Sequence, residues 1–79
     1  MVDMSVPQPG RHVAAFDPQS RSIAVSRELG KPDYFEVFTG EVGVVLRVTP
    51  HVTGSGRYVL VKFTDSHIGY VHESNLRNI

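Results

Sequence analysis

The chain has 79 residues, with eight lysines and arginines, eight aspartates and glutamates, and no cysteine. This length predicts one domain with a small core. The absence of cysteine excludes a thiol nucleophile, a cysteine-bound iron–sulfur cluster and a cysteine-based zinc site on this chain. The balanced charge disfavours nucleic-acid binding, which usually accompanies a basic excess.

The first ten residues contain Pro7, Pro9 and Gly10 and few large apolar side chains. They lack the basic-then-apolar layout of a secretory signal. The chain also contains no run of about 18 apolar residues, so no transmembrane helix is expected. We predict a flexible arm over residues 1–10, a folded domain over residues 11–79, and a cytoplasmic location with no membrane span.

A short strand is predicted over residues 11–16 (RHVAAF). Val13 and Ala15 would share one face of it, because side chains alternate along a strand. The Asp17-Pro18 step that follows is typical of a turn.

Residues 20–31 are less regular. Their alternation allows a strand at residues 22–26, whereas Ser26 and Gly30 could instead cap and end a helical turn over residues 26–29. We favour a long loop with one short strand. A loop of this length in a small domain is more often functional, or covered by a partner, than idle.

Residues 34–38 (YFEVF) are dense in aromatic side chains. Two interpretations stay open for them. They could form a hydrophobic cluster in the core, or Tyr34, Phe35 and Phe38 could form an exposed contact surface.

The second half of the chain predicts a meander of antiparallel strands. We place Val42, Val44, Leu46 and Val48 toward the core, and a bulge or sharp bend at Gly40 and Gly43, where the strand begins. The predicted elements are strands over residues 41–49 and 57–63 with a hairpin tip at 50–56, a short strand at 68–71, a 3-10 turn at 73–76 and a closing strand at 77–79. With residues 11–16, these five strands predict an all-β fold, a small five-stranded antiparallel barrel with one 3-10 turn.

No arrangement of residues typical of catalysis is present. The four histidines (His12, His51, His67 and His72) have no spacing that enforces a metal site, and the serine in residues 54–56 (GSG) lies in a predicted hairpin tip. The carboxylates are few and scattered. We therefore predict no catalytic residue, no metal site and no cofactor, and we expect that the chain is not an enzyme.

A basic and aromatic surface remains as a candidate site. Arg47, Tyr58 and Lys62 could share the outward face of the predicted hairpin, with Arg57 at its edge. Such a surface suits an acidic protein through complementary charge, or nucleic acid through stacking and phosphate contacts. A solvated face without a partner is the third interpretation.

Two short segments resemble SH3-like barrels. Gly69-Tyr70-Val71 followed by Ser74-Asn75-Leu76 is similar to the closing strand and 3-10 turn of that fold. The glycine-rich residues 40–45 (GEVGVV) are similar to the opening of KOW-type barrels of transcription and ribosomal factors.

A closer resemblance is to the variable (α) chain of ferredoxin–thioredoxin reductase, one of the electron-transport accessory barrels. Residues 10–13 (GRHV), 40–42 (GEV) and 59–63 (VLVKF) resemble its strands, and His72 with Leu76 and Ile79 resembles its ending. The family's His-His-Pro loop is replaced by DPQS at residues 17–20.

The resemblance implies an SH3-like barrel that acts as a docking or stabilising subunit for a catalytic redox chain. The partner-binding residues that we select are Tyr34, Phe35, Phe38, Arg47, Arg57, Tyr58 and Lys62. The leading hypothesis is therefore a protein partner, a redox enzyme. The alternative is a KOW-like module that binds nucleic acid, and a weaker third is an enzyme whose site forms only at an oligomer axis.

Overall fold

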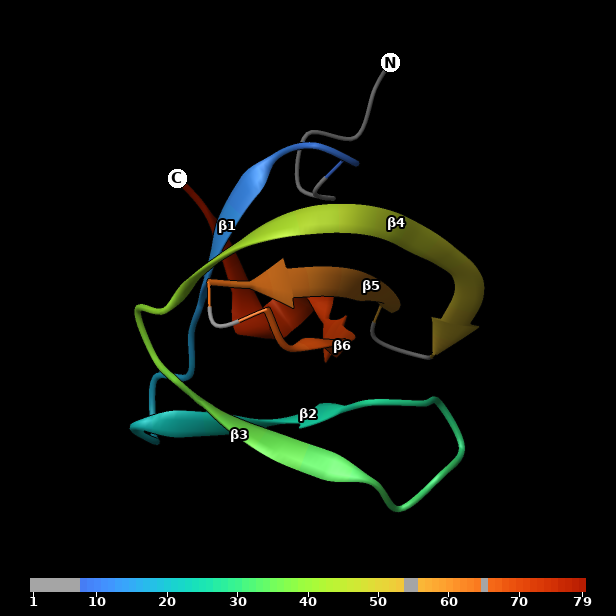
Figure 1. Ribbon diagram of the computed structural model, residues 1–79, viewed down its shortest axis with the longest axis horizontal. Coiled ribbons are helices and arrows are strands. Elements are labelled where there is room, and N and C mark those ends of the chain that lie inside the picture. Colours follow the sequence, from blue (N-terminus) through green and yellow to red (C-terminus); the bar gives the residue numbers. More distant parts are fainter. Residues whose placement is uncertain (1–7, 54–55, 65) are drawn as a thin grey trace.

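Seven strands form where branched and aromatic side chains alternate with polar ones. They are seen in a computed structural model that describes residues 8–53, 56–64 and 66–79 (Figure 1). In chain order the elements are β1 (His12–Ala15), β2 (Ser22–Ser26), β3 (Tyr34–Phe38), β4 (Val42–Thr53), β5 (Gly56–Phe63), β6 (Ile68–His72), the 3-10 turn η1 (Glu73–Asn75) and β7 (Leu76–Asn78).

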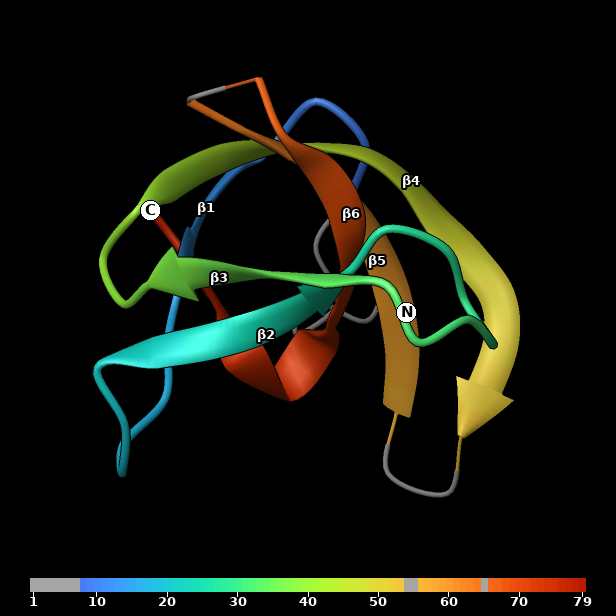
Figure 2. The same cartoon turned by 60° about the horizontal axis from the view of Figure 1, so that its bottom comes forward.

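The strands make one antiparallel sheet in the order β3-β2-β6-β5-β4-β1-β7. β1 pairs with both β4 and β7, so the last strand lies beside the first. In Figure 1 and Figure 2, β4 arches over β5, and the β2–β3 hairpin lies on the other side of β5 and β6. The sheet thus curls around one core.

The all-β class is confirmed, but the prediction of a closed five-stranded barrel is wrong. The sheet has seven strands and is open, with β3 and β7 at its two edges. The two additional strands are β2 and β3. β2 confirms the one short strand predicted at residues 22–26, whereas β3 forms at residues 34–38, where an aromatic cluster or contact surface and no strand is predicted. They pair with each other in five consecutive residue pairs, from Ser22–Phe38 to Ser26–Tyr34. This hairpin occupies the place where a long loop was predicted.

The core lies inside the curled sheet and receives residues from all seven strands. Val13, Val25, Val59 and Val61 are fully buried, and Phe63 is the largest side chain among the most buried ones. The half-buried Phe35 packs edge-on against Phe63, with ring centroids 6.5 Å apart. The buried apolar residues of the described chain are Val13, Ala15, Ile23, Val25, Val37, Val45, Val59, Val61, Phe63, Val71 and Leu76.

A bulge in β4 changes which face of that strand points inward, so the predicted inward face is wrong at Val42, Val44 and Leu46 and correct at Val48. Val45 is buried and Leu46 is 42% exposed, whereas Leu46 was predicted to face the core. The pairing with β5 runs regularly to Val45, shifts, and resumes at Arg47. Because Leu46 is an extra residue in the ladder, the odd-numbered Gly43 and Val45 are buried before it, whereas the even-numbered Val48 packs against the core after it. The hairpin tip is also shorter than predicted, since β4 extends to Thr53.

The predicted 3-10 turn is confirmed at η1. The His72 side chain caps this turn, because its Nδ1 accepts a hydrogen bond from the Ser74 backbone N–H at 3.2 Å. Asn75 Nδ2 donates to the Phe16 carbonyl at 3.1 Å and fixes the turn to the end of β1. The turn delivers Leu76 to the core, where it is 8% exposed. The closing strand begins there, one residue earlier than predicted.

The predicted flexible arm lies outside the described residues except for residues 8–10. Within those three, the Gly10 N–H donates to the Val45 carbonyl at 2.7 Å, and Gly10 adopts a left-handed φ of 88°. In the part of the chain that the structure describes, no helix has the length and apolarity to cross a membrane.

Gly69 is expected to tolerate no side chain. A Cβ added to it would lie 2.8 Å from Phe35 Cε1 and 2.9 Å from the Ser26 carbonyl oxygen, and closer still to Val25 Cγ1. We predict that Gly69→Ala lowers the free energy of unfolding by about 1–3 kcal/mol, as expected of overpacking. Chemical denaturation of the variant measures this loss.

Gly30→Ala is the matched control. Gly30 has a φ of 81° and nothing within 4 Å of an added Cβ. Its cost of about 1 kcal/mol would therefore come from the backbone alone. A loss in Gly69→Ala smaller than the loss in Gly30→Ala would contradict the steric explanation.

Candidate functional site

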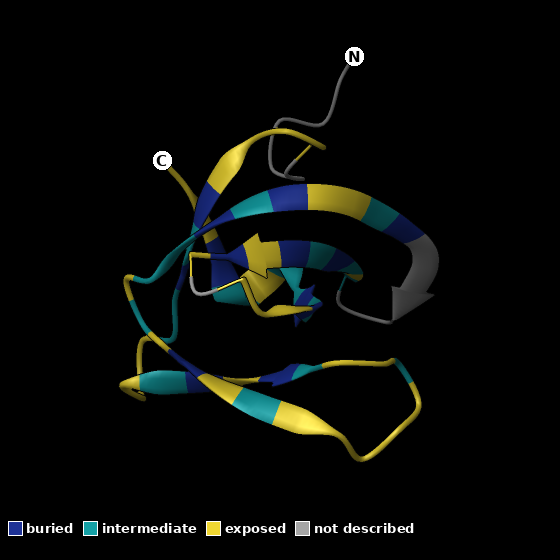
Figure 3. Ribbon diagram, viewed as in Figure 1, coloured by how far each residue is buried: buried dark blue, intermediate teal, exposed yellow. Residues whose placement is uncertain are grey.

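All three tyrosines of the chain line one groove between the β2–β3 hairpin and the strands β5 and β6. Its volume is about 230 Å³. The lining residues are Ala24, Ser26, Leu29, Gly30, Tyr34, Tyr58, Tyr70, Val71, His72 and Asn75. We call this set the tyrosine groove. In Figure 3 the hairpin loop that borders it is mostly exposed.

Strand pairing explains why these residues meet. Tyr34 pairs with Ser26, Ser26 with Tyr70, and Tyr70 with Leu60, so a row of side chains crosses β3, β2, β6 and β5. Leu60 pairs in turn with Arg47 of β4. The row lies on the outer face of the sheet because the neighbouring residues of each strand fill the core.

The groove opens where two strands separate. Ser26–Tyr70 is the one residue pair that joins β2 to β6. Beyond it toward His72 the two strands no longer pair, whereas β5 and β6 stay paired as far as Tyr58–His72. The space between Ala24 and His72 is therefore not closed by a sheet ladder.

The polar groups of the groove include three tyrosine hydroxyls, each of which can donate a hydrogen bond. Arg47 Nη2 donates to the Tyr70 hydroxyl oxygen at 3.0 Å, which leaves the Tyr70 O–H proton available for a ligand. The hydroxyls of Tyr34 and Tyr58 have no hydrogen-bond partner among the described residues. The Asn75 amide is already bonded to Phe16. Phenol protons from three strands can thus reach an acceptor in the groove.

The aromatic rings provide the apolar surface. Tyr34 is 60% exposed. Tyr58 packs edge-on against the His72 ring, with centroids 5.5 Å apart at 87°. None of the lining residues is Asp, Glu, Lys or Arg. The groove is therefore aromatic, presents three hydroxyl groups and lacks carboxylate, ammonium and guanidinium groups in its lining.

Three of the residues selected from the sequence belong to this groove or adjoin it. Tyr34 and Tyr58 line it, and Arg47 contacts Tyr70. The structure does not bring the other four to the same place.

Phe35 points inward, where it packs on Phe63 and lies 5.1 Å from the His67 ring. Phe38 is 62% exposed at the far end of β3, opposite Ser22. Lys62 is exposed in the pair with Ile68, and Arg57 lies at the start of β5, where its backbone N–H donates to Glu73 Oε1 at 3.0 Å.

Sequence reasoning did not select Tyr70, His72, Leu29 and Asn75. A signal for Tyr70 was present, since Val71 belongs to the core and the preceding residue must then face outward with Tyr58. Leu29 gave no signal, because it lies in the loop of a hairpin that was not predicted.

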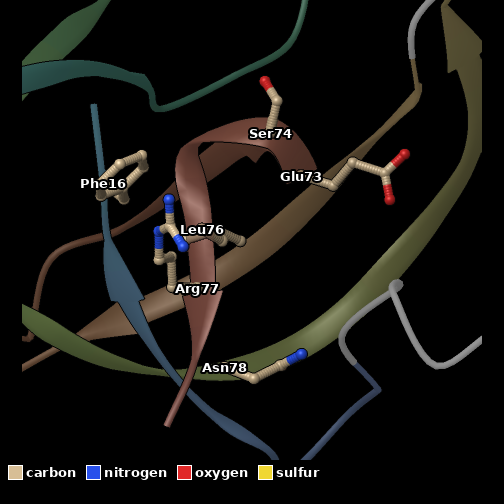
Figure 4. Close-up of a pocket in the computed structure, with 6 residues that line it drawn as sticks. All are labelled: Phe16, Glu73, Ser74, Leu76, Arg77 and Asn78. Carbon is tan, nitrogen blue, oxygen red and sulfur yellow. The ribbon is translucent and has the colours of Figure 1, made fainter. Parts of the chain in front are cut away.

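A second hollow, of about 330 Å³, lies beside η1 and β7. Arg77 stacks on Phe16, with its guanidinium carbon 3.8 Å from the ring centroid. Figure 4 shows that Glu73 points away from Arg77, toward the opposite side of the turn. The charged side chains that line this hollow, Glu73 and Arg77, therefore do not point toward a common ligand position. In the described ranges no three His, Cys, Asp or Glu residues are grouped so that they could hold a metal ion.

Comparison with known proteins gives no independent assignment. No protein-family model matches the chain. No curated protein matches it, and no solved structure does. The tyrosine groove is therefore interpreted from its own geometry and chemistry.

Proposed function

We propose that the chain is a non-catalytic protein-binding domain that holds an extended segment of a partner in the tyrosine groove. The observation that carries this proposal is the convergence of Tyr34, Tyr58 and Tyr70 from three strands on one uncharged groove. Tyrosine is enriched in binding sites because it combines a large apolar ring with a polar tip.

The three tyrosine hydroxyls of the lining can donate to a segment rich in carbonyl acceptors. A polyproline II helix exposes its backbone carbonyls, since it makes no internal hydrogen bonds, and its prolines have no N–H group that needs an acceptor. Aromatic grooves bind such segments through ring packing. A proline-rich segment of a partner protein is therefore the ligand that fits best.

The order of elements supports an SH3-like arrangement. A first strand is followed by a hairpin, a three-stranded meander, a 3-10 turn and a last strand that pairs with the first. We further propose that the partner is a catalytic redox chain, as the resemblance to the ferredoxin–thioredoxin reductase variable chain implies. Absorption from an iron–sulfur cluster in the purified complex, together with the lack of turnover by the isolated chain, tests this assignment.

Nucleic acid is the alternative ligand, and the positions of the cations give it less support. Arg27 pairs with Asp33 and donates to the Tyr34 carbonyl, and Arg77 stacks on Phe16. Arg47 donates to the Tyr70 hydroxyl, so the described arginines are spread over separate places and do not form one basic track along the groove. Phosphate binding needs cations that follow the ligand backbone.

We predict that the labelled chain binds an acetylated and amidated decapeptide of proline, with NMR shifts centred on Tyr58, Tyr70 and His72. Tyr58→Ala should weaken binding about fivefold or more, as expected when a central aromatic contact is truncated. Phe38→Ala is the matched control, because this exposed ring lies outside the groove. Equal losses in the two variants would contradict the proposed site.

We predict that Tyr70→Phe weakens the same complex by about two- to tenfold, because one hydrogen bond of about 0.5–1.5 kcal/mol is lost while the ring stays. The free energy of unfolding should change by no more than about 0.5 kcal/mol, because the hydrogen bond between Arg47 and Tyr70 lies at the surface. Undiminished affinity would show that the hydroxyl does not reach the ligand.

We predict that single-stranded oligonucleotides bind weakly or not at all at low salt. A gel shift at about 50 mM salt that disappears by about 200 mM would instead indicate phosphate neutralisation. That outcome would favour the nucleic-acid alternative.

A further inference from the structure

β3 lies at one edge of the sheet, and no described strand covers its outer side. It pairs with β2 without a register shift over its whole length. The opposite edge, β7, has only three residues. A regular edge of five residues that lacks proline and lysine is open to pairing with another chain.

The hydrogen bonds at the ends of the hairpin show which β3 residues face outward. The Thr39 N–H donates to the Arg21 carbonyl at 2.8 Å, and the Arg27 N–H donates to the Asp33 carbonyl at 2.9 Å. In an antiparallel ladder, residues that exchange such bonds alternate with residues that do not. Odd-numbered residues of β3 therefore direct their backbone groups to β2.

Tyr34, Glu36 and Phe38 direct their N–H and C=O groups to the outer edge. Two of these six groups have partners already, because Arg27 Nη1 donates to the Tyr34 carbonyl at 3.3 Å and the Glu41 N–H donates to the Phe38 carbonyl at 3.1 Å. Three N–H groups and the Glu36 carbonyl remain for a neighbouring strand.

The side chains of the same three residues make a pattern of aromatic, acidic and aromatic groups. Tyr34 and Phe38 are 60% and 62% exposed. Between them, Glu36 Oε2 accepts a hydrogen bond from Ser22 Oγ at 3.0 Å, which orients the carboxylate. Among the described residues no cation pairs with Glu36, since the one ion pair there joins Arg27 and Asp33.

We propose that the outer edge of β3 binds an extended segment of another protein as an eighth strand, with a lysine or arginine opposite Glu36 and an apolar residue two positions to each side. Directly opposed charges stabilise a strand pair, and the apolar residues would cover Tyr34 and Phe38. A second copy of this chain fits less well, because symmetric pairing about Glu36 would oppose two carboxylates. This edge is separate from the tyrosine groove except for Tyr34.

The test uses two peptides, Ac-TVTKTVT-NH2 and Ac-TVTETVT-NH2, titrated into the labelled chain up to millimolar concentration. The lysine peptide should bind about three- to tenfold more tightly than the glutamate peptide, from the difference between attraction and repulsion across the pair. It should also slow hydrogen exchange at the amides of Tyr34, Glu36 and Phe38. Glu36→Lys should reverse the preference while leaving decaproline binding unchanged.

A matched pair of modified peptides distinguishes strand pairing at this edge from non-specific binding. N-methylation of the lysine removes an N–H group on the β3 side and should abolish binding, whereas N-methylation of the adjacent threonine alters a group that points away and should not. Absence of binding, or a preference that Glu36→Lys leaves unchanged, would overturn the proposal. Concentration-dependent protection of the same amides without peptide would overturn it in favour of a second copy.

Discussion

The fold depends on a close approach between β2 and β6 at Gly69. The β2–β3 hairpin is joined to the rest of the sheet at one residue pair, Ser26–Tyr70, and the neighbouring Gly69 leaves room for Val25 and the Ser26 carbonyl. A side chain at this point would push the hairpin away from β5 and β6. The hairpin supplies Ile23, Val25 and Val37 to the core, so its position decides how well that core is sealed. The same junction also sets one wall of the tyrosine groove and leaves β3 as an edge.

Local alternation was sufficient to predict much of this fold. Val13 and Ala15 in β1, Val59, Val61 and Phe63 in β5, and Leu76 after the 3-10 turn are buried as their spacing indicated. The errors arose where the structure depends on partners distant in sequence. The bulge at Leu46 exchanges the two faces of β4, and no glycine or proline at the bulge marks it. Whether the sheet closes depends on whether its edge strands meet, and strand patterns do not determine this.

The candidate site likewise combines residues that local patterns predict with residues whose position depends on distant strand pairing. Tyr34, Tyr58 and Arg47 could be selected from residue type and strand parity, but the pairing that brings Tyr70 between them could not. Phe35 was grouped with Tyr34 because both are aromatic, although adjacent residues of a strand face opposite sides and Phe35 packs on Phe63. A site built from one residue on each of several strands exists only once the register is known. Residue type can indicate candidate residues for such a site, but the strand register determines which of them lie next to one another.

The two occupied carbonyls of β3 have a consequence for colloidal behaviour. Sheets grow into fibrils when an edge offers an unbroken row of donors and acceptors to each incoming chain. Here the Arg27 side chain occupies the carbonyl at one end of the row, and the turn at Glu41 occupies the carbonyl at the other. An added strand therefore finds three N–H donors at this edge but only one carbonyl acceptor, that of Glu36. The uncovered edge, with its two exposed aromatic rings, thus offers an incoming strand fewer hydrogen-bonding groups than the complete row from which fibrils grow.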